Sequence, residues 1–116
     1  MSTAVPTTRP PAVEDEDPAY KRLRVVLDRA YDQASRGKGR ERHANGEPFE
    51  DQLIVKLGQF LGHSTDGNVF QACKKAIESK RLPRDRAVAE LLGAINYLAG
   101  AVIILEDRPE SSTDGR

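Results

Sequence analysis

A short loop between two helix-like segments holds the residue types that could bind a phosphate. Residues 37–49 combine three glycines with the permanent cations Lys38, Arg40 and Arg42 and with a histidine, His43. Glycine lets backbone N–H groups approach a ligand closely, and clustered Lys and Arg side chains suit a phosphate-bearing ligand. We therefore predict that a ligand site would include this loop, with a solvated polar turn as the alternative interpretation.

Aromatic residues lie close to this loop in the sequence. Tyr31 precedes it by one to two helical turns, and Phe49 closes it. Aromatic rings that stack on bases, beside cations that hold phosphates, are the two halves of nucleotide recognition. Tyr31, with Tyr20 as the alternative, is therefore a candidate for base stacking, although either tyrosine could instead belong to the core.

The length and composition allow one domain. Residues 1–17 are rich in proline and end in an acidic run, and residues 108–116 lack an apolar period, so we expect both ends to be disordered tails. Residues 18–107 remain as a helical ligand-binding and oligomerisation domain. A domain of this size buries only a modest hydrophobic core, and such domains often gain stability by forming oligomers.

The charge balance argues against bulk binding to nucleic acid. The formal net charge is zero, yet residues 74–86 hold six Lys and Arg against two acids, so a local basic surface is expected. The single cysteine, Cys73, excludes an intramolecular disulfide and fits a reducing compartment. The N-terminus does not resemble a signal peptide, so we expect a cytoplasmic protein.

Hydrophobic periodicity predicts four helices and no strand, hence an all-α fold built as a small helical bundle. Asp17 can cap the first helix and Pro18 suits its first turn, whereas Leu82-Pro83 should end the third. We expect the apolar face of the third helix to be buried, with Cys73 as a small buried hydrophobe. That face comprises Val69, Phe70, Cys73, Ala76 and Ile77. The predicted helices cover residues 18–36, 53–61, 68–82 and 84–106.

The last helix is long and apolar, and one of its faces is made of small residues. Residues 91–105 are apolar all round except for Asn96. Fifteen residues are too few to span a bilayer comfortably, so we expect a central bundle helix that is covered on every side. Ala89, Gly93, Asn96 and Gly100 share one face, which lets another helix approach closely, either within the protomer or from a second copy. Asn96 needs a hydrogen bond there and could fix the register.

Other site chemistries have less support in the sequence. The two histidines, His43 and His63, and the lone cysteine lack metal-ligand spacing, so no metal or cofactor is expected. The all-α magnesium-dependent nucleoside triphosphate pyrophosphohydrolases gather Glu and Asp on facing helices, and Glu90 begins a stretch that faintly matches their pattern. However, Gly93 and Ala94 occupy the positions where that pattern has an acidic residue. The acids considered for this alternative are Glu50, Asp51, Glu90, Glu106 and Asp107.

The runs at residues 37–52, 79–82 and 90–99 resemble small helical proteins of bacteriophages, in particular the anti-CBASS sponge family, and the resemblance covers residues 19–106. It implies a helical protomer in a symmetric homo-oligomer, usually a hexamer. It also implies a protein of the host bacterial cytoplasm, not an enzyme, that sequesters cyclic di- and trinucleotides between protomers without cleaving them.

Within this family a tyrosine stacks on a base and basic side chains reach the phosphates. On this chain the resemblance implies Tyr31 as the stacking tyrosine and Lys38 as the residue that reaches a phosphate, with Tyr20 as the alternative tyrosine. Arg81, in the basic turn at residues 79–82, is the candidate for a second phosphate contact. The alternatives are the pyrophosphohydrolase and a non-catalytic helical protein that binds a partner.

Overall fold

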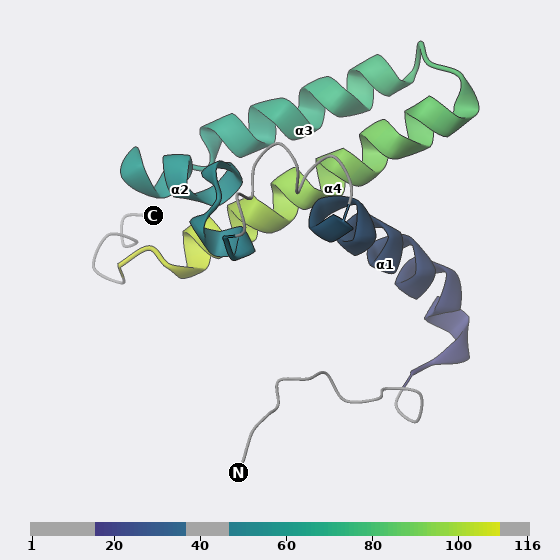
Figure 1. The fold of residues 1–116 in the computed structure, drawn as a ribbon, viewed down its shortest axis with the longest axis horizontal. Helices are drawn as coiled ribbons and strands as arrows, with labels where there is room; N and C mark the ends of the chain where they lie inside the picture. Colours follow the sequence, from purple (N-terminus) through teal and green to yellow (C-terminus); the bar gives the residue numbers. More distant parts are fainter. Residues whose placement is uncertain (1–15, 37–46, 110–116) are drawn as a thin grey trace.

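The computed structural model describes residues 16–36 and 47–109, and every element in these ranges is helical (Figure 1). Two short 3-10 helices, Pro18–Tyr20 and Phe49–Asp51, precede the longer ones. The α-helices are α1 (Lys21–Arg36), α2 (Leu53–Phe60), α3 (Asp66–Ser79) and α4 (Arg84–Glu106). The predicted all-α class and the four predicted helices are confirmed. The expected tails fall largely outside the described residues.

Local sequence signals explain where the helices begin and end. The Asp17 carboxylate accepts a hydrogen bond of 2.9 Å from the Ala19 backbone N–H, as a cap should. The first turn after it is a 3-10 turn, so the α-helical part starts at Lys21. Pro83 is the N-cap of α4, with extended backbone, whereas α3 ends at Ser79, earlier than the end at Leu82-Pro83 that the sequence predicts.

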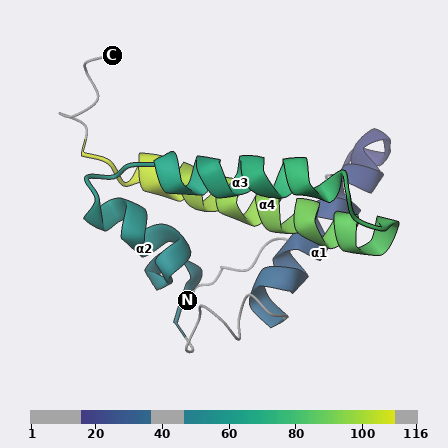
Figure 2. The ribbon, with the colours of Figure 1, turned by 90° about the horizontal axis from the view of Figure 1, so that it is seen from above.

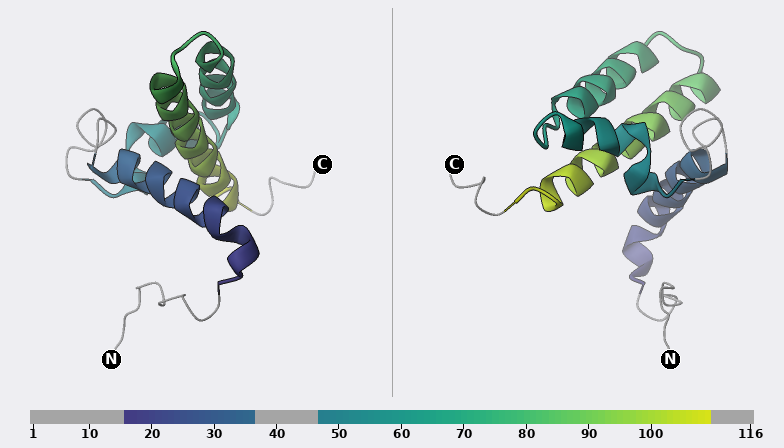
Figure 3. Two further views of the ribbon diagram at one scale, coloured as in Figure 1. Left: turned by 90° about the vertical axis from the view of Figure 1, so that its right-hand side faces the viewer. Right: turned by 60° about the vertical axis from the view of Figure 1, so that its left-hand side comes forward.

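The central element is α4, and the other helices pack on it (Figure 1). α3 runs antiparallel beside it, and the two form a hairpin. α1 crosses α4 on another side, and α2 lies near the C-terminal half of α4 (Figures 2 and 3). The short turn between α3 and α4 brings the basic residues 80–86 to one end of this hairpin.

Close contacts at the C-terminal half of α4 hold three helices together. Ile104 and Val55 are fully buried there. A Cβ atom built on Gly58 would lie 2.5 Å from the Ile104 Cδ1 atom, so only glycine allows α2 to approach α4 this closely. The Asn68 side-chain amide on α3 donates to the Ile54 carbonyl at 2.8 Å and to the Tyr97 carbonyl at 2.9 Å. One buried amide therefore links α2, α3 and α4.

The small-residue face of α4 packs within the protomer. The Asn96 Nδ2 atom donates to the Ala30 carbonyl at 3.0 Å, and the Gln33 Nε2 atom donates to the Ala89 carbonyl at 3.1 Å. Gly93 is buried beside these contacts. Of the two alternatives left open by the sequence, the structure therefore shows this face packed within one chain, against α1 at Asn96 and against the other helices at Gly93 and Gly100.

The prediction that the apolar face of α3 is buried is wrong for the protomer. Phe70 and Ile77 are each 62% exposed, and Cys73 is exposed as well. α3 instead turns Asn68 and Ala72 toward its neighbours. These short side chains let α3 lie close to α4, where Asn68 reaches carbonyls on α2 and α4.

The expectation that α4 is covered on every side is also wrong within the protomer. Of its most apolar stretch, only 28% is buried. By length and composition the 23-residue helix could cross a membrane, but the core helix of a soluble protein meets the same criteria. The described part of the protomer is therefore more open than a closed bundle.

Candidate ligand cleft

A cleft of about 750 Å³ opens between the described helices and is lined by residues of α1, α3 and α4 and of the segment that leads into α2. It lies between the C-terminal end of α1, the N-terminal end of α2, the C-terminal end of α3 and the first half of α4. Its volume is in the range of small-molecule sites, about 300–1,000 Å³. The residues that carry its charge are Lys75, Glu78, Arg81, Arg86 and Glu90.

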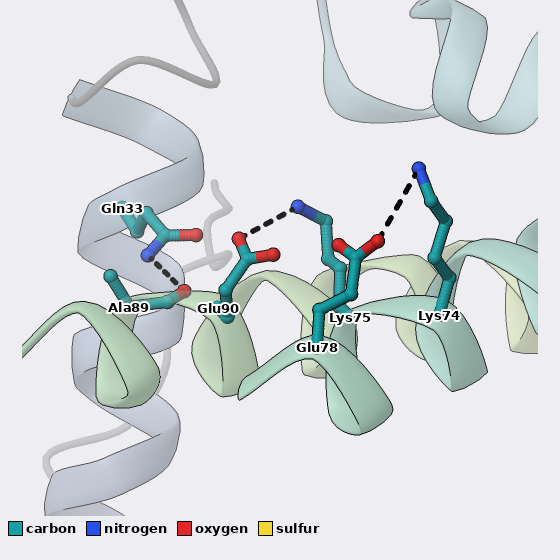
Figure 4. A network of polar contacts seen from close by, with 6 residues as sticks. All are labelled: Gln33, Lys74, Lys75, Glu78, Ala89 and Glu90. Atoms are coloured by element: carbon teal, nitrogen blue, oxygen red, sulfur yellow. Dashed lines mark hydrogen bonds and ion pairs between the residues drawn. The ribbon is translucent and has the colours of Figure 1, made fainter. Parts of the chain in front are cut away.

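The acidic residues of the cleft both pair with lysines. The Lys75 Nζ atom lies 3.2 Å from a Glu90 carboxylate oxygen, which joins α3 to α4. Glu78 pairs with Lys74 one turn earlier on α3, at 3.9 Å. Figure 4 shows both pairs beside the hydrogen bond from Gln33 to Ala89. The lysine charges at this wall of the cleft are therefore balanced locally.

The two arginines of the cleft differ from the lysines. Arg81 follows α3 and Arg86 lies in the first turns of α4, and both are exposed. Within residues 16–36 and 47–109, neither guanidinium forms an ion pair. A planar guanidinium can donate two parallel hydrogen bonds to a phosphate, so this end of the cleft is suited to an anion.

Aromatic and amide groups complete the wall of the cleft. Tyr97 lies on α4, and the Lys75 ammonium lies 5.9 Å from the centre of its ring, within cation–π range. Phe49 contributes a second aromatic ring from the 3-10 helix before α2. Gln33 and Asn96 bring side-chain amides into the same space. The cleft thus offers charge, aromatic surface and hydrogen-bonding groups together.

The structure brings only part of the predicted site to this cleft. Arg81 lines it, as does Phe49, which the sequence placed beside the loop. Tyr31 and Tyr20 are 67% and 62% exposed, and neither is among the described residues that line the cleft. The other predicted residues lie outside the described residues: Lys38, Arg40, Arg42 and His43. The flanking residue Ala34 lines the cleft.

Sequence reasoning did not select Lys75, Arg86 and Tyr97 as site residues. Arg86 and Lys75 belong to the basic run at residues 74–86, which predicted a basic surface without identifying which cations share a space. Glu90, Gly93 and Tyr97 follow helical spacing and so lie on one face of α4. That spacing was the available signal for Tyr97.

The acidic residues considered for a pyrophosphohydrolase are not gathered into a metal site in the part of the chain that the structure describes. No group of three or more His, Cys, Asp or Glu side chains that could hold a metal ion occurs there. Glu90 is paired with Lys75, and Asp107 accepts a hydrogen bond of 2.9 Å from Gln59 near the far end of α4. The geometry therefore adds no support to that alternative.

Comparisons with known proteins found no matching family model, no similar curated protein and no similar solved structure. The chemistry of the cleft and the resemblance seen in the sequence are therefore the observations that bear on function.

Proposed function

We propose that this protein binds cyclic oligonucleotide second messengers in the cleft and holds them without cleavage. In biological terms this would make it a phage-encoded sponge for immune signals in the host bacterium, as its resemblance to the anti-CBASS sponge family implies. The observation that carries the proposal is the pair Arg81 and Arg86. These guanidinium groups line a cleft with aromatic rings and have no ion-pair partner among the described residues.

The cleft residues match the parts of such a ligand. A cyclic dinucleotide carries two phosphates and two bases. Arg81 and Arg86 would hold phosphate, and Tyr97 or Phe49 would stack on a base. A charge-assisted hydrogen bond contributes about 1.5–3 kcal/mol, and a base–aromatic stack about 1–3 kcal/mol. Several such contacts together can reach the roughly 12 kcal/mol that nanomolar binding requires.

Holding a ligand without cleaving it requires no general base and no metal. A sponge removes one signal molecule for each site that it fills, so tight binding is sufficient for its function. The loop cations Lys38, Arg40, Arg42 and His43, together with Tyr31, remain predicted contributors from the sequence, and the four loop residues lie outside the described residues. Tyr31 is exposed on α1 and free to stack on a base.

Calorimetric titration of the full chain with a panel of cyclic di- and trinucleotides tests this proposal. We expect at least one of them to bind with a submicromolar Kd, and the ligand released by heat denaturation to have its original mass. Linear or hydrolysed products that form with magnesium and disappear with a chelator would instead support an enzyme. The absence of binding across the panel would leave the partner-binding alternative.

A further inference from the structure

One face of α4 carries a heptad pattern that the protomer leaves without a partner. From residue 88 to residue 105, large apolar side chains recur at alternating steps of three and four residues, the spacing of a and d positions in a coiled coil. Every a position is β-branched and every d position is leucine. We call these six residues the α4 seam: Val88, Leu91, Ile95, Leu98, Val102 and Leu105.

Four of the six seam residues are exposed and Val88 and Ile95 are half-buried, and the seam lies on a different face of α4 from the residues that pack against the other helices. The exposed fractions are 44% for Leu91, 46% for Leu98, 54% for Val102 and 48% for Leu105. The contacts to α1, α2 and α3 come from other positions, among them Gly93, Asn96, Gly100 and Ile104. Most of the apolar surface of the seam is therefore left uncovered by the described helices.

α3 presents further exposed apolar side chains away from the cleft. Its cleft residues, Lys75 and Glu78, lie on one side of the helix, whereas Val69, Cys73 and Ala76 follow helical spacing on another side. Val69 is 43% exposed, and Cys73 and Ala76 are exposed as well. The hairpin thus combines the α4 seam with an apolar stripe on α3.

We infer that a second copy of this chain covers this surface, with the two α4 seams packed antiparallel about a two-fold axis. In this pairing every layer joins a β-branched residue to a leucine. The layers are Val88 with Leu105, Leu91 with Val102, and Ile95 with Leu98. The same axis places the two α3 helices on one side of the α4 pair, so that four helices pack together.

The charges at the two ends of α4 favour this orientation. The first turn carries Arg84 and Arg86 around Asp85, whereas the last turn ends in Glu106 and Asp107, followed by Arg108, whose guanidinium donates to the His63 carbonyl. An antiparallel pair brings the basic end of one helix to the acidic end of the other. A parallel pair would place like charges together, and opposite alignment of the helix dipoles adds to the preference.

A lipid bilayer is the less suitable occupant of this surface. Burial in lipid would also take in the Lys75–Glu90 ion pair and the three helices packed on α4. Contact with lipid needs no heptad spacing, whereas β-branched residues at a and leucine at d are the pattern that favours pairing of two helices. None of the six seam residues lines the cleft, so seam variants and cleft variants test the two proposals separately; Arg86 belongs both to the cleft and to the basic end of α4.

The oligomeric mass of the full chain tests the inference. Light scattering should give an even multiple of 12.8 kDa, and Leu98→Glu should halve that mass while the helical circular dichroism is unchanged. Val25→Glu is the matched control, because Val25 is 48% exposed on α1, outside the seam. A monomeric wild type, or an assembly that Leu98→Glu leaves intact, would overturn the inference, as would transfer of the wild type into lipid vesicles.

Disulfide trapping tests the orientation without relying on a disruptive variant. Leu91→Cys chains and Val102→Cys chains, each also carrying Cys73→Ser, are oxidised separately and as a mixture. The antiparallel pair predicts a disulfide between the two kinds of chain. It predicts none between two Leu91→Cys chains, whose residues would lie about 16 Å apart along the helix, beyond disulfide reach. Self-linked Leu91→Cys dimers, or no cross-link at all, would contradict it.

Discussion

Replacing both cleft arginines in one chain, Arg81→Ala with Arg86→Ala, is expected to weaken cyclic dinucleotide binding by about two to four orders of magnitude. Each lost charge-assisted contact costs about 1.5–3 kcal/mol, and each 1.4 kcal/mol is a tenfold change in Kd. Neither arginine forms an ion pair within the described residues, so their removal should leave the fold intact. Calorimetric titration of the double variant measures the change.

Arg84→Ala is the matched control for this variant. Arg84 belongs to the same basic run and is exposed, as the two cleft arginines are, but it does not line the cleft. Its replacement removes one positive charge from the same region and should change Kd by a small factor through long-range electrostatics only. An equal loss of affinity in Arg84→Ala and in each single cleft variant would indicate binding to diffuse charge and not to the cleft.

Ile104→Ala is expected to have the largest effect on stability, a loss of about 2–5 kcal/mol in the free energy of unfolding. Ile104 is fully buried on α4 and contacts Gly58 of α2, so the shorter side chain leaves a cavity where these helices meet. Small domains are stable by only about 5–15 kcal/mol, so urea unfolding should shift to markedly lower denaturant. The midpoint and slope of that transition measure the loss.

Leu23→Ala provides the comparison, because Leu23 is 54% exposed on α1. Its replacement should change the free energy of unfolding by about 0.5 kcal/mol or less. If Ile104→Ala unfolds at the same urea concentration as Leu23→Ala, the contact between α2 and α4 does not hold the fold together as described.

The helices were predictable because their signals are local. The cap at Asp17, the proline at Pro83 and the apolar periodicity each act within a few residues, and the bounds of α4 agree with the prediction. Burial was less predictable, because apolar periodicity identifies the apolar face of a helix but not the surface that packs against it. The face with Phe70 and Ile77 is an example, because no other described helix packs over these two side chains and they are exposed.

The cleft was predictable only in part. Arg81 was selected from a basic turn, but the partners that it meets there come from elsewhere in the chain. Tyr97 and Phe49 reach the same cleft through the packing of α4 against the start of α2, which no local pattern encodes. The internal role of Gly93 and Asn96 also depended on which helices would lie over them: α1 covers Asn96, and Lys75 of α3 and Gln33 of α1 cover Gly93.

Nuclear magnetic resonance of the full chain with labelled arginine and tyrosine side chains tests the central claim most directly, because it locates the ligand. On titration with the cyclic oligonucleotide that binds best, the Nε–Hε signals of Arg81 and Arg86 and the ring signals of Tyr97 should shift together and saturate at one concentration. Shifts confined to Tyr20 and Tyr31, with the signals of the cleft unchanged, would contradict binding in the cleft.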